Sequence, residues 1–82
     1  MNEIFLIGRV ENKVKYKFII NSKKYFSKVE FEIELDKQIF KVKGYNNIAD
    51  FCYRKLKKND IVFISGRIER NMTIKIKTIL II

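Results

Sequence analysis

Residues 48–68 constrain the fold most, because they predict one short amphipathic helix followed directly by a strand. Ile48, Cys52 and Leu56 recur every four residues, so one face of the helix can be buried. Cys52 lies on this apolar face and is predicted to pack in the core, as free cysteines commonly do. The β-branched and aromatic residues 61–64 predict the strand that follows.

Polar residues mark both ends of the predicted helix. Asn47 is the expected N-cap, and Asp50, three residues later, can complete a short capping box. Asn59 can adopt the left-handed conformation that ends a helix, and Asp60 can turn the chain outward. The rest of the chain has the character of strands, so a single helix lies between strands.

Length and charge limit the possible functions. The 82 residues predict one domain, residues 1–82, with a thin core that a second subunit would help to cover. The formal charge of +9 favours a polyanionic partner, although a solvated lysine-rich surface has the same composition. The apolar runs are too short to span a bilayer and no signal-peptide pattern follows the first residue, so we expect a cytoplasmic protein. With no histidine and a lone cysteine without a nearby base, we expect neither an enzyme nor a metal or cofactor site.

The first strand, predicted over residues 1–11, contains the apolar run 4–7. A run without alternation predicts burial on both faces, and in a small barrel the outer face is then expected to meet another subunit. We therefore expect a homodimer or homotetramer built through this strand. Gly8, inside the strand, predicts a bulge or a sharp bend.

The most concentrated basic segment is residues 13–28, which contains six lysines and no acidic residue. Its first half alternates, with lysines on one side and Tyr16 and Phe18 on the other. Tyr25 and Phe26 follow a polar turn. Cations beside aromatic rings are what a single-stranded nucleic-acid surface needs, although Tyr16 or Phe18 can also face the core.

Two further strands are predicted on either side of a turn at residues 36–37. The outward positions of the first are Glu30, Glu32 and Glu34. Lys41 and Lys43 point outward from the second, so cross-strand ion pairs are expected, each contributing a few tenths of a kcal/mol to about 1 kcal/mol. If the glutamates lay in a binding groove they would repel phosphate. This face can therefore dock a protein instead, with the nucleic acid passing over residues 13–28 and the last strand.

The last strand is predicted over residues 73–82, with Ile74, Ile76 and Thr78 on one face. One helix between the third and fourth main strands is the arrangement of the five-stranded OB barrel. The predicted fold class is therefore an all-β barrel with one short helix.

Several segments, in order, resemble the bacterial single-stranded DNA-binding protein family and, more loosely, the primosomal replication protein with the same barrel. The matching segments are residues 2–10 (NEIFLIGRV), 14–16, 45–50, 56–58, 62–64 and 66–68. The resemblance implies an OB fold that binds single-stranded DNA without catalysis, and it places Tyr45 where that family has a base-stacking aromatic residue.

The sequence departs from the family at three features. We expect no counterpart of the family's acidic C-terminal tail, and the family's two long DNA-embracing loops are shortened to residues 36–37 and 69–71. The chain has no tryptophan, and Ile39 occupies one position where the family stacks a base. The resemblance therefore implies neither the family's tail-mediated recruitment of partners nor its tight wrapping of DNA.

We therefore expect a single-stranded DNA-binding protein of replication or recombination, in an accessory or mobile-element form. The candidate nucleic-acid-binding residues are Arg9, Lys13, Lys15, Tyr16, Lys17, Tyr25, Phe26, Lys41, Lys43, Tyr45, Arg67, Arg70, Lys75 and Lys77. The alternative is an OB module that docks a polymerase, helicase or primase through its apolar first and last strands. RNA remains a possible ligand, but the aromatic strand motif of cold-shock domains is missing.

Overall fold

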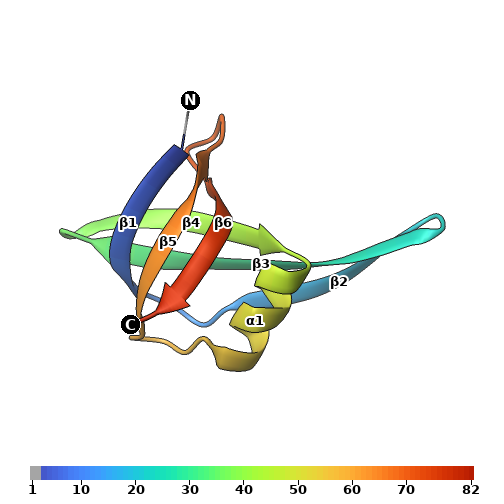
Figure 1. Ribbon diagram of the computed structural model, residues 1–82, viewed down its shortest axis with the longest axis horizontal. Coiled ribbons are helices and arrows are strands. Elements are labelled where there is room, and N and C mark those ends of the chain that lie inside the picture. Colours follow the sequence, from blue (N-terminus) through green and yellow to red (C-terminus); the bar gives the residue numbers. More distant parts are fainter. Residues whose placement is uncertain (1–2) are drawn as a thin grey trace.

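Five strands close into a barrel, and a sixth strand extends one of its hairpins (Figure 1). The computed structural model describes residues 3–82, so the first two residues of the predicted first strand lie outside it. The elements are β1 (Glu3–Val10), β2 (Lys15–Asn21), β3 (Lys24–Leu35), β4 (Gln38–Tyr45), α1 (Asn47–Lys55), β5 (Ile61–Ile68) and β6 (Ile74–Ile81).

The strand order explains how the barrel closes. The sheet runs β1-β5-β6-β4-β3-β2, and an additional pairing of β1 with β3 closes the first five strands. The closing pairs are short: Arg9 and Val10 of β1 pair with β3, and Val42 and Lys43 of β4 pair in parallel with β6. The predicted five-stranded barrel with one helix before its last two strands is therefore confirmed.

The core follows the predicted alternation. Val29, Ile33, Val42 and Ile64 are almost completely buried at the centre of the barrel. Cys52, on the inner face of α1, is also fully buried, which confirms the prediction that it packs in the core. Burial raises the pKa of this thiol to about 12, so it stays protonated and unreactive at neutral pH.

The predicted ends of the helix are wrong by a few residues. The N-cap is Asn46, with φ 55°, and no side chain caps the helix. Asp50 does not form a capping box, because its carboxylate accepts hydrogen bonds from Tyr16 and Ser27. The helix ends at Lys55, and Asn59 adopts its left-handed conformation (φ 78°) in the loop beyond.

β1 alternates instead of being buried on both faces. Its inward residues Ile4 and Leu6 pack against the core, whereas Phe5 and Ile7 remain 66% and 51% exposed. Gly8 causes no bulge, since it pairs in register with Val62. A Cβ at Gly8 would lie 2.9 Å from the Glu34 carbonyl oxygen, so the glycine permits close approach of β3.

The bulge lies between β5 and β6 instead. Ser65 pairs with Thr78 and Gly66 pairs with Ile76, so Lys77 is the extra residue. The extra residue reverses the alternation, which makes the predicted inward position of Thr78 wrong. Its hydroxyl contacts that of Ser65 on the outer side of β5, and Ile79 packs against the core in its place.

The β3–β4 hairpin has the predicted register but not the predicted ion pairs. Glu30 lies opposite Lys43 and Glu32 opposite Lys41, around a turn in which Asp36 has a positive φ. The carboxylates nevertheless find other partners. Glu30 lies 3.9 Å from Lys28, Glu34 binds Arg9, and Lys43 binds Glu69.

Candidate nucleic-acid interface

The outer surface of β2, β3 and β4 brings aromatic rings and lysines together. Lys17 lies opposite Lys28, and Lys28 lies opposite Tyr45, so the three side chains form one row across the sheet. The Phe26 ring lies 6.0 Å from the Tyr45 ring, centroid to centroid. Lys75 of β6 places its Nζ 5.5 Å from the Tyr45 ring centre. We call the surface formed by Lys17, Phe26, Lys28, Tyr45 and Lys75 the Tyr45 face.

Pairing registers hold the Tyr45 face in place. Side chains on directly opposed strand positions project from the same side of a sheet, and successive residues project from opposite sides. Tyr45 is the last residue of β4, and the next amide, Asn46 N–H, donates to the Ser27 carbonyl over 2.9 Å. The end of the strand is therefore fixed beside Phe26 before the chain enters α1.

Lys43 and Glu69 neutralise each other at the edge of this face. The hydrogen bond to Glu69 raises the pKa of Lys43, and the same bond lowers the pKa of Glu69. The charges of Lys75 and Arg67 lower the pKa of Glu69 further. Sequence reasoning did not find Glu69, because it is brought to β4 only when β6 pairs with that strand.

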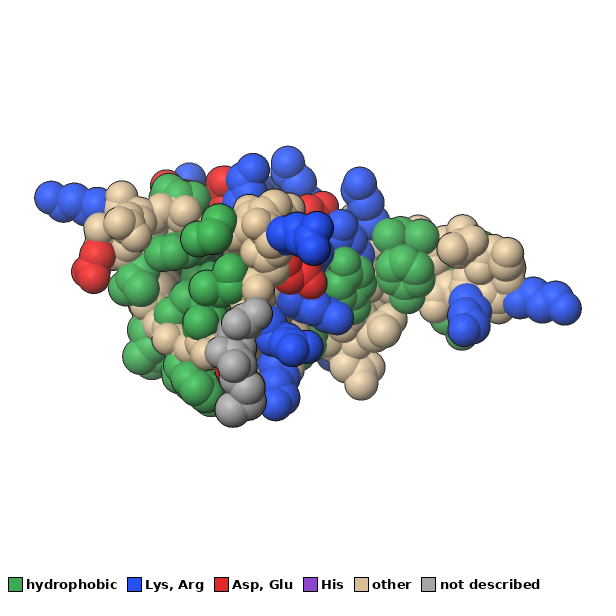
Figure 2. Space-filling model, turned by 90° about the horizontal axis from the view of Figure 1, so that it is seen from above, with side chains coloured by type: hydrophobic (Ala, Val, Ile, Leu, Met, Phe, Trp, Pro, Cys, Tyr) green, Lys and Arg blue, Asp and Glu red, His purple; other side chains and the backbone are tan. Residues whose placement is uncertain are grey.

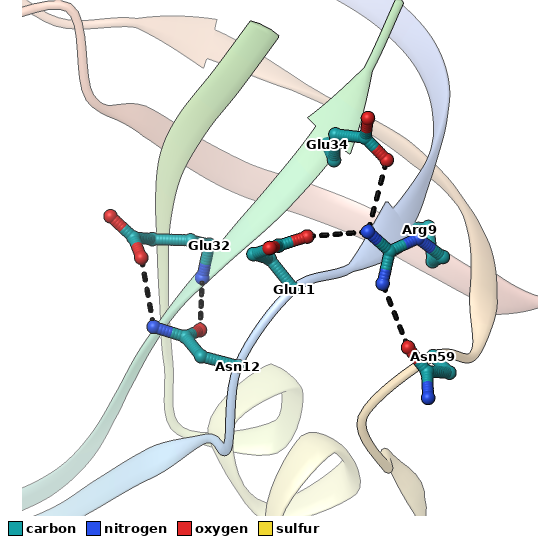
Figure 3. Close-up of polar contacts among 6 residues, drawn as sticks. All are labelled: Arg9, Glu11, Asn12, Glu32, Glu34 and Asn59. Carbon is teal, nitrogen blue, oxygen red and sulfur yellow. Dashed lines mark hydrogen bonds and ion pairs between the residues drawn. The ribbon is translucent and has the colours of Figure 1, made fainter. Parts of the chain in front are cut away.

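Arg9 is engaged within the protein (Figure 3). Its guanidinium donates to Glu11 at 2.6 Å, to Glu34 at 3.0 Å and to Asn59 at 2.7 Å. The hydrogen bond to Glu34 is the main reason that the pKa of Arg9 is raised. These bonds join the end of β1 to β3 and to the loop before β5, so Arg9 serves the closure of the barrel.

Glu32, in the outward row formed by Glu30, Glu32 and Glu34, also binds within the protein. Asn12 donates to the Glu32 carboxylate and accepts from the Glu32 amide, both at 2.9 Å (Figure 3). Lys15 lies opposite Glu30, and Lys41 opposite Glu32. A polar hollow of about 260 Å³, lined by Asn12 and these four side chains among others, lies on the outer surface here.

Tyr16 is placed against the helix rather than on the Tyr45 face. Its hydroxyl donates to Asp50 over 2.9 Å, and its ring lies 4.5 Å from that of Tyr53. The hydrogen bond to Asp50 is the main cause of the raised pKa of Tyr16. Tyr25 also projects from the side opposite Phe26, because the two residues are consecutive in β3.

The remaining candidates do not belong to the Tyr45 face as defined above. Arg67 lies opposite Lys75 on β5, which places it near the face. Lys77, the extra residue of the bulge, binds Glu3 at 3.4 Å. Lys13 and Arg70 are exposed in the connections before β2 and β6.

Lys28 was missed as a binding candidate, although it lies two residues after Phe26 in the same strand and therefore projects from the same side of the sheet.

Figure 2 shows Lys and Arg side chains over the middle of the molecule and at the end of the hairpin on the right.

Neither a metal centre nor a membrane helix is found in residues 3–82. Within that range, no three His, Cys, Asp or Glu side chains cluster in a way that could hold a metal ion. None of the helical structure in the same range is long and apolar enough to cross a membrane.

Comparison with known proteins gives matches at the level of structure. No protein-family model and no curated protein sequence matches the chain. The SSB domain of a Synechococcus protein superposes with a TM-score of 0.83 at 18% identity, covering 96% of this chain and 93% of that one. The chain has the OB fold. The fold implied by the sequence resemblance is thereby confirmed.

Two further OB-fold structures support this assignment. The second OB-fold domain of replication protein A from Methanococcus maripaludis matches with a TM-score of 0.79 and 21% identity, covering 95% of this chain and 81% of that one. The small single-stranded DNA-binding protein from Streptomyces coelicolor matches with a TM-score of 0.69 and 18% identity, covering 100% and 95%. At these identities the structural similarity establishes the OB fold alone. The function has to be inferred from the side chains of the candidate interface.

Proposed function

We propose that this chain binds single-stranded DNA without catalysis, through the Tyr45 face. The observation that carries the proposal is the placement of the Tyr45 and Phe26 rings among Lys17, Lys28 and Lys75 on one continuous surface. Both rings are half-buried, so part of each ring remains accessible from solvent. Accessible rings stack bases of any sequence, and lysines neutralise the phosphates between them. Affinity then depends little on sequence and strongly on salt.

The structural neighbours support DNA as the ligand. One matched structure is named a single-stranded DNA-binding protein, one an SSB domain, and one an OB-fold domain of replication protein A. The lone cysteine is buried and protonated, which argues against nucleophilic catalysis. We place the chain in DNA replication or recombination in the cytoplasm, as an accessory or mobile-element protein.

A second exposed surface supports self-association. Phe5, Ile7 and Leu80 are each at least half exposed on the outer side of β1 and β6, and Phe5 stacks on Phe63 of β5. Figure 2 shows hydrophobic side chains gathered on the left, where Figure 1 places β1. We expect a homodimer or homotetramer through this surface, with a sedimentation coefficient above that of a 9.9 kDa chain.

The alternative function uses the same apolar surface. If the protein sediments as a monomer, Phe5, Ile7 and Leu80 are better explained as the docking site for a replication enzyme such as a polymerase, helicase or primase. That outcome, together with no binding of DNA, would favour a protein–protein module over a DNA-binding protein.

Fluorescence anisotropy with labelled oligo-dT tests the proposed function. We expect binding at low salt, with log K falling against log salt at a slope of roughly 0.7 per phosphate neutralised. Glu69→Gln should tighten binding by a few-fold and steepen this slope, because it removes an anion beside Lys43, Lys75 and Arg67.

Asp36→Asn is the matched control for Glu69→Gln. It removes the same charge at the β3–β4 turn, away from the Tyr45 face, and should change the affinity much less. Because the pKa of Glu69 is lowered, the Lys43–Glu69 pair persists at neutral pH and is lost only as the pH falls through that lowered value. No binding by the wild type at low salt would overturn the proposal. Equal effects of Glu69→Gln and Asp36→Asn on the affinity would show that Glu69 does not lie at the interface.

A further inference from the structure

The hairpin made by β2 and the first half of β3 has a second exposed surface. This hairpin, residues 15–30, projects away from the barrel and is called the arm (right of Figure 1). Phe18, Ile20 and Tyr25 are 58%, 73% and 71% exposed on one side of it. The centroids of the Phe18 and Tyr25 rings lie 5.4 Å apart with 31° between the ring planes, so the two rings form a tilted pair.

This ring pair lies on the opposite side of the arm from the Tyr45 face. Phe18 is paired with Ser27, and Ile20 with Tyr25, whereas Phe26 belongs to the alternate positions. The helix covers this side only near the barrel, where Tyr16 and Ser27 bond to Asp50. The helix does not cover the Phe18 and Tyr25 rings, which lie farther out along the arm. Packing in the core therefore does not explain why these positions are aromatic.

Charge identifies the chemistry of the missing partner. Residues 13–28 contain six lysines and no acidic residue, and Lys23 and Lys24 lie at the tip of the arm. Lys17, Lys24 and Lys28 project from the opposite side of the arm to this ring pair, and Lys23 lies in the turn between the two strands. A partner that reaches both the rings and these ammonium groups must therefore pass around the arm and carry flat apolar groups and regularly spaced anions. Single-stranded nucleic acid has both, and rings of this kind stack its bases whatever their sequence.

We propose that the Phe18–Tyr25 pair is a second stacking site for the DNA strand that the Tyr45 face binds. The inference rests on the proposed function and extends it, because the strand would pass around the arm. The arm is only two strands wide, about 5 Å between strand axes, so a strand leaving Phe26 can cross its edge. β2 is the terminal strand of the sheet order, which leaves that edge open.

Oligonucleotide length separates the two sites. Anisotropy is measured with dT of about 6 nucleotides, which the Tyr45 face can hold alone, and of about 16 nucleotides, the upper site size of an OB fold. Phe18→Ala with Tyr25→Ala should weaken binding of the longer strand by about 10-fold and leave the shorter one unchanged. Ile20→Ala, an apolar truncation on the same side without a ring, should change either affinity by less than about 2-fold, and Tyr25→Phe should keep full binding because it keeps the ring.

The outcomes decide separately between the two proposals. Wild-type binding of the short strand tests the Tyr45 face, and its absence would overturn the proposed function. A double variant that binds both lengths like the wild type would overturn the arm site while the Tyr45 face stands. A double variant that instead lowers the sedimentation coefficient, with unchanged binding of the longer strand, would assign this side of the arm to a protein contact. A melting temperature equal to that of the wild type would show that the double variant is folded.

Discussion

Tyr45→Ala combined with Phe26→Ala is expected to weaken oligo-dT binding by roughly 10²-fold. Each lost stack between a base and an aromatic ring removes about 1–3 kcal/mol of binding free energy. The two rings contact each other, so their losses need not add, and the two single variants are measured beside the double. The loss should be similar at low and high salt, because stacking is not an ionic interaction.

Two controls make this result specific. Tyr45→Phe keeps the ring beside Lys75 and should bind like the wild type. Tyr53→Ala removes an exposed tyrosine on α1, outside the Tyr45 face, and should leave the affinity nearly unchanged. A double variant with wild-type affinity would show that the DNA does not stack on the Tyr45 face. A double variant that lost only the salt dependence would contradict the assigned role of the rings.

Gly66→Ala is expected to cause the largest loss of stability among the glycine substitutions. A Cβ at this position would overlap the carbonyl oxygen of Lys75, a backbone atom fixed by pairing of β5 with β6 at the bulge. Overpacking of this kind lowers the free energy of unfolding by about 1–3 kcal/mol. In a domain of this size, each kcal/mol lowers the melting temperature by about 4–8 °C, which differential scanning calorimetry measures.

Gly44→Ala is the matched comparison. A Cβ at Gly44 would meet the side chain of Ile48 rather than a backbone carbonyl, so the first turn of the helix can move to accept it. We expect a smaller fall in melting temperature than for Gly66→Ala. The reverse order would mean that the contact between β5 and β6 is more adaptable than the packing of α1.

The sequence predicted those features that depend on local alternation. The inward positions of Val29, Ile33 and Val42 follow from period two, and the burial of Cys52 follows from the spacing along the helix. The register of the β3–β4 hairpin follows from its two-residue turn. Tyr45 and Lys17 lie on one surface, and their binding of DNA stays a prediction.

Features that depend on distant pairing could not be predicted in the same way. The bulge at Lys77 arises from the fit between β5 and β6, and it moves Thr78 out of the core. The Lys43–Glu69 ion pair requires β6 to lie beside β4. Tyr16 alternates against the lysines of β2, but the acceptor that its hydroxyl meets on that side, Asp50, comes from the helix, 34 residues farther along the chain.

The short closing pairs of the barrel have a consequence for how the chain assembles. β2, β3 and β4 are joined by two-residue turns, so residues 15–45 can form their three-stranded sheet from neighbouring segments alone. β1 instead pairs with β5 across most of the chain, and the two seams that close the barrel, β1 with β3 and β4 with β6, hold only two residue pairs each. Four of the five residues of the Tyr45 face therefore belong to one continuous stretch of polypeptide, and the strand pairs that align them need no segment from either end of the chain.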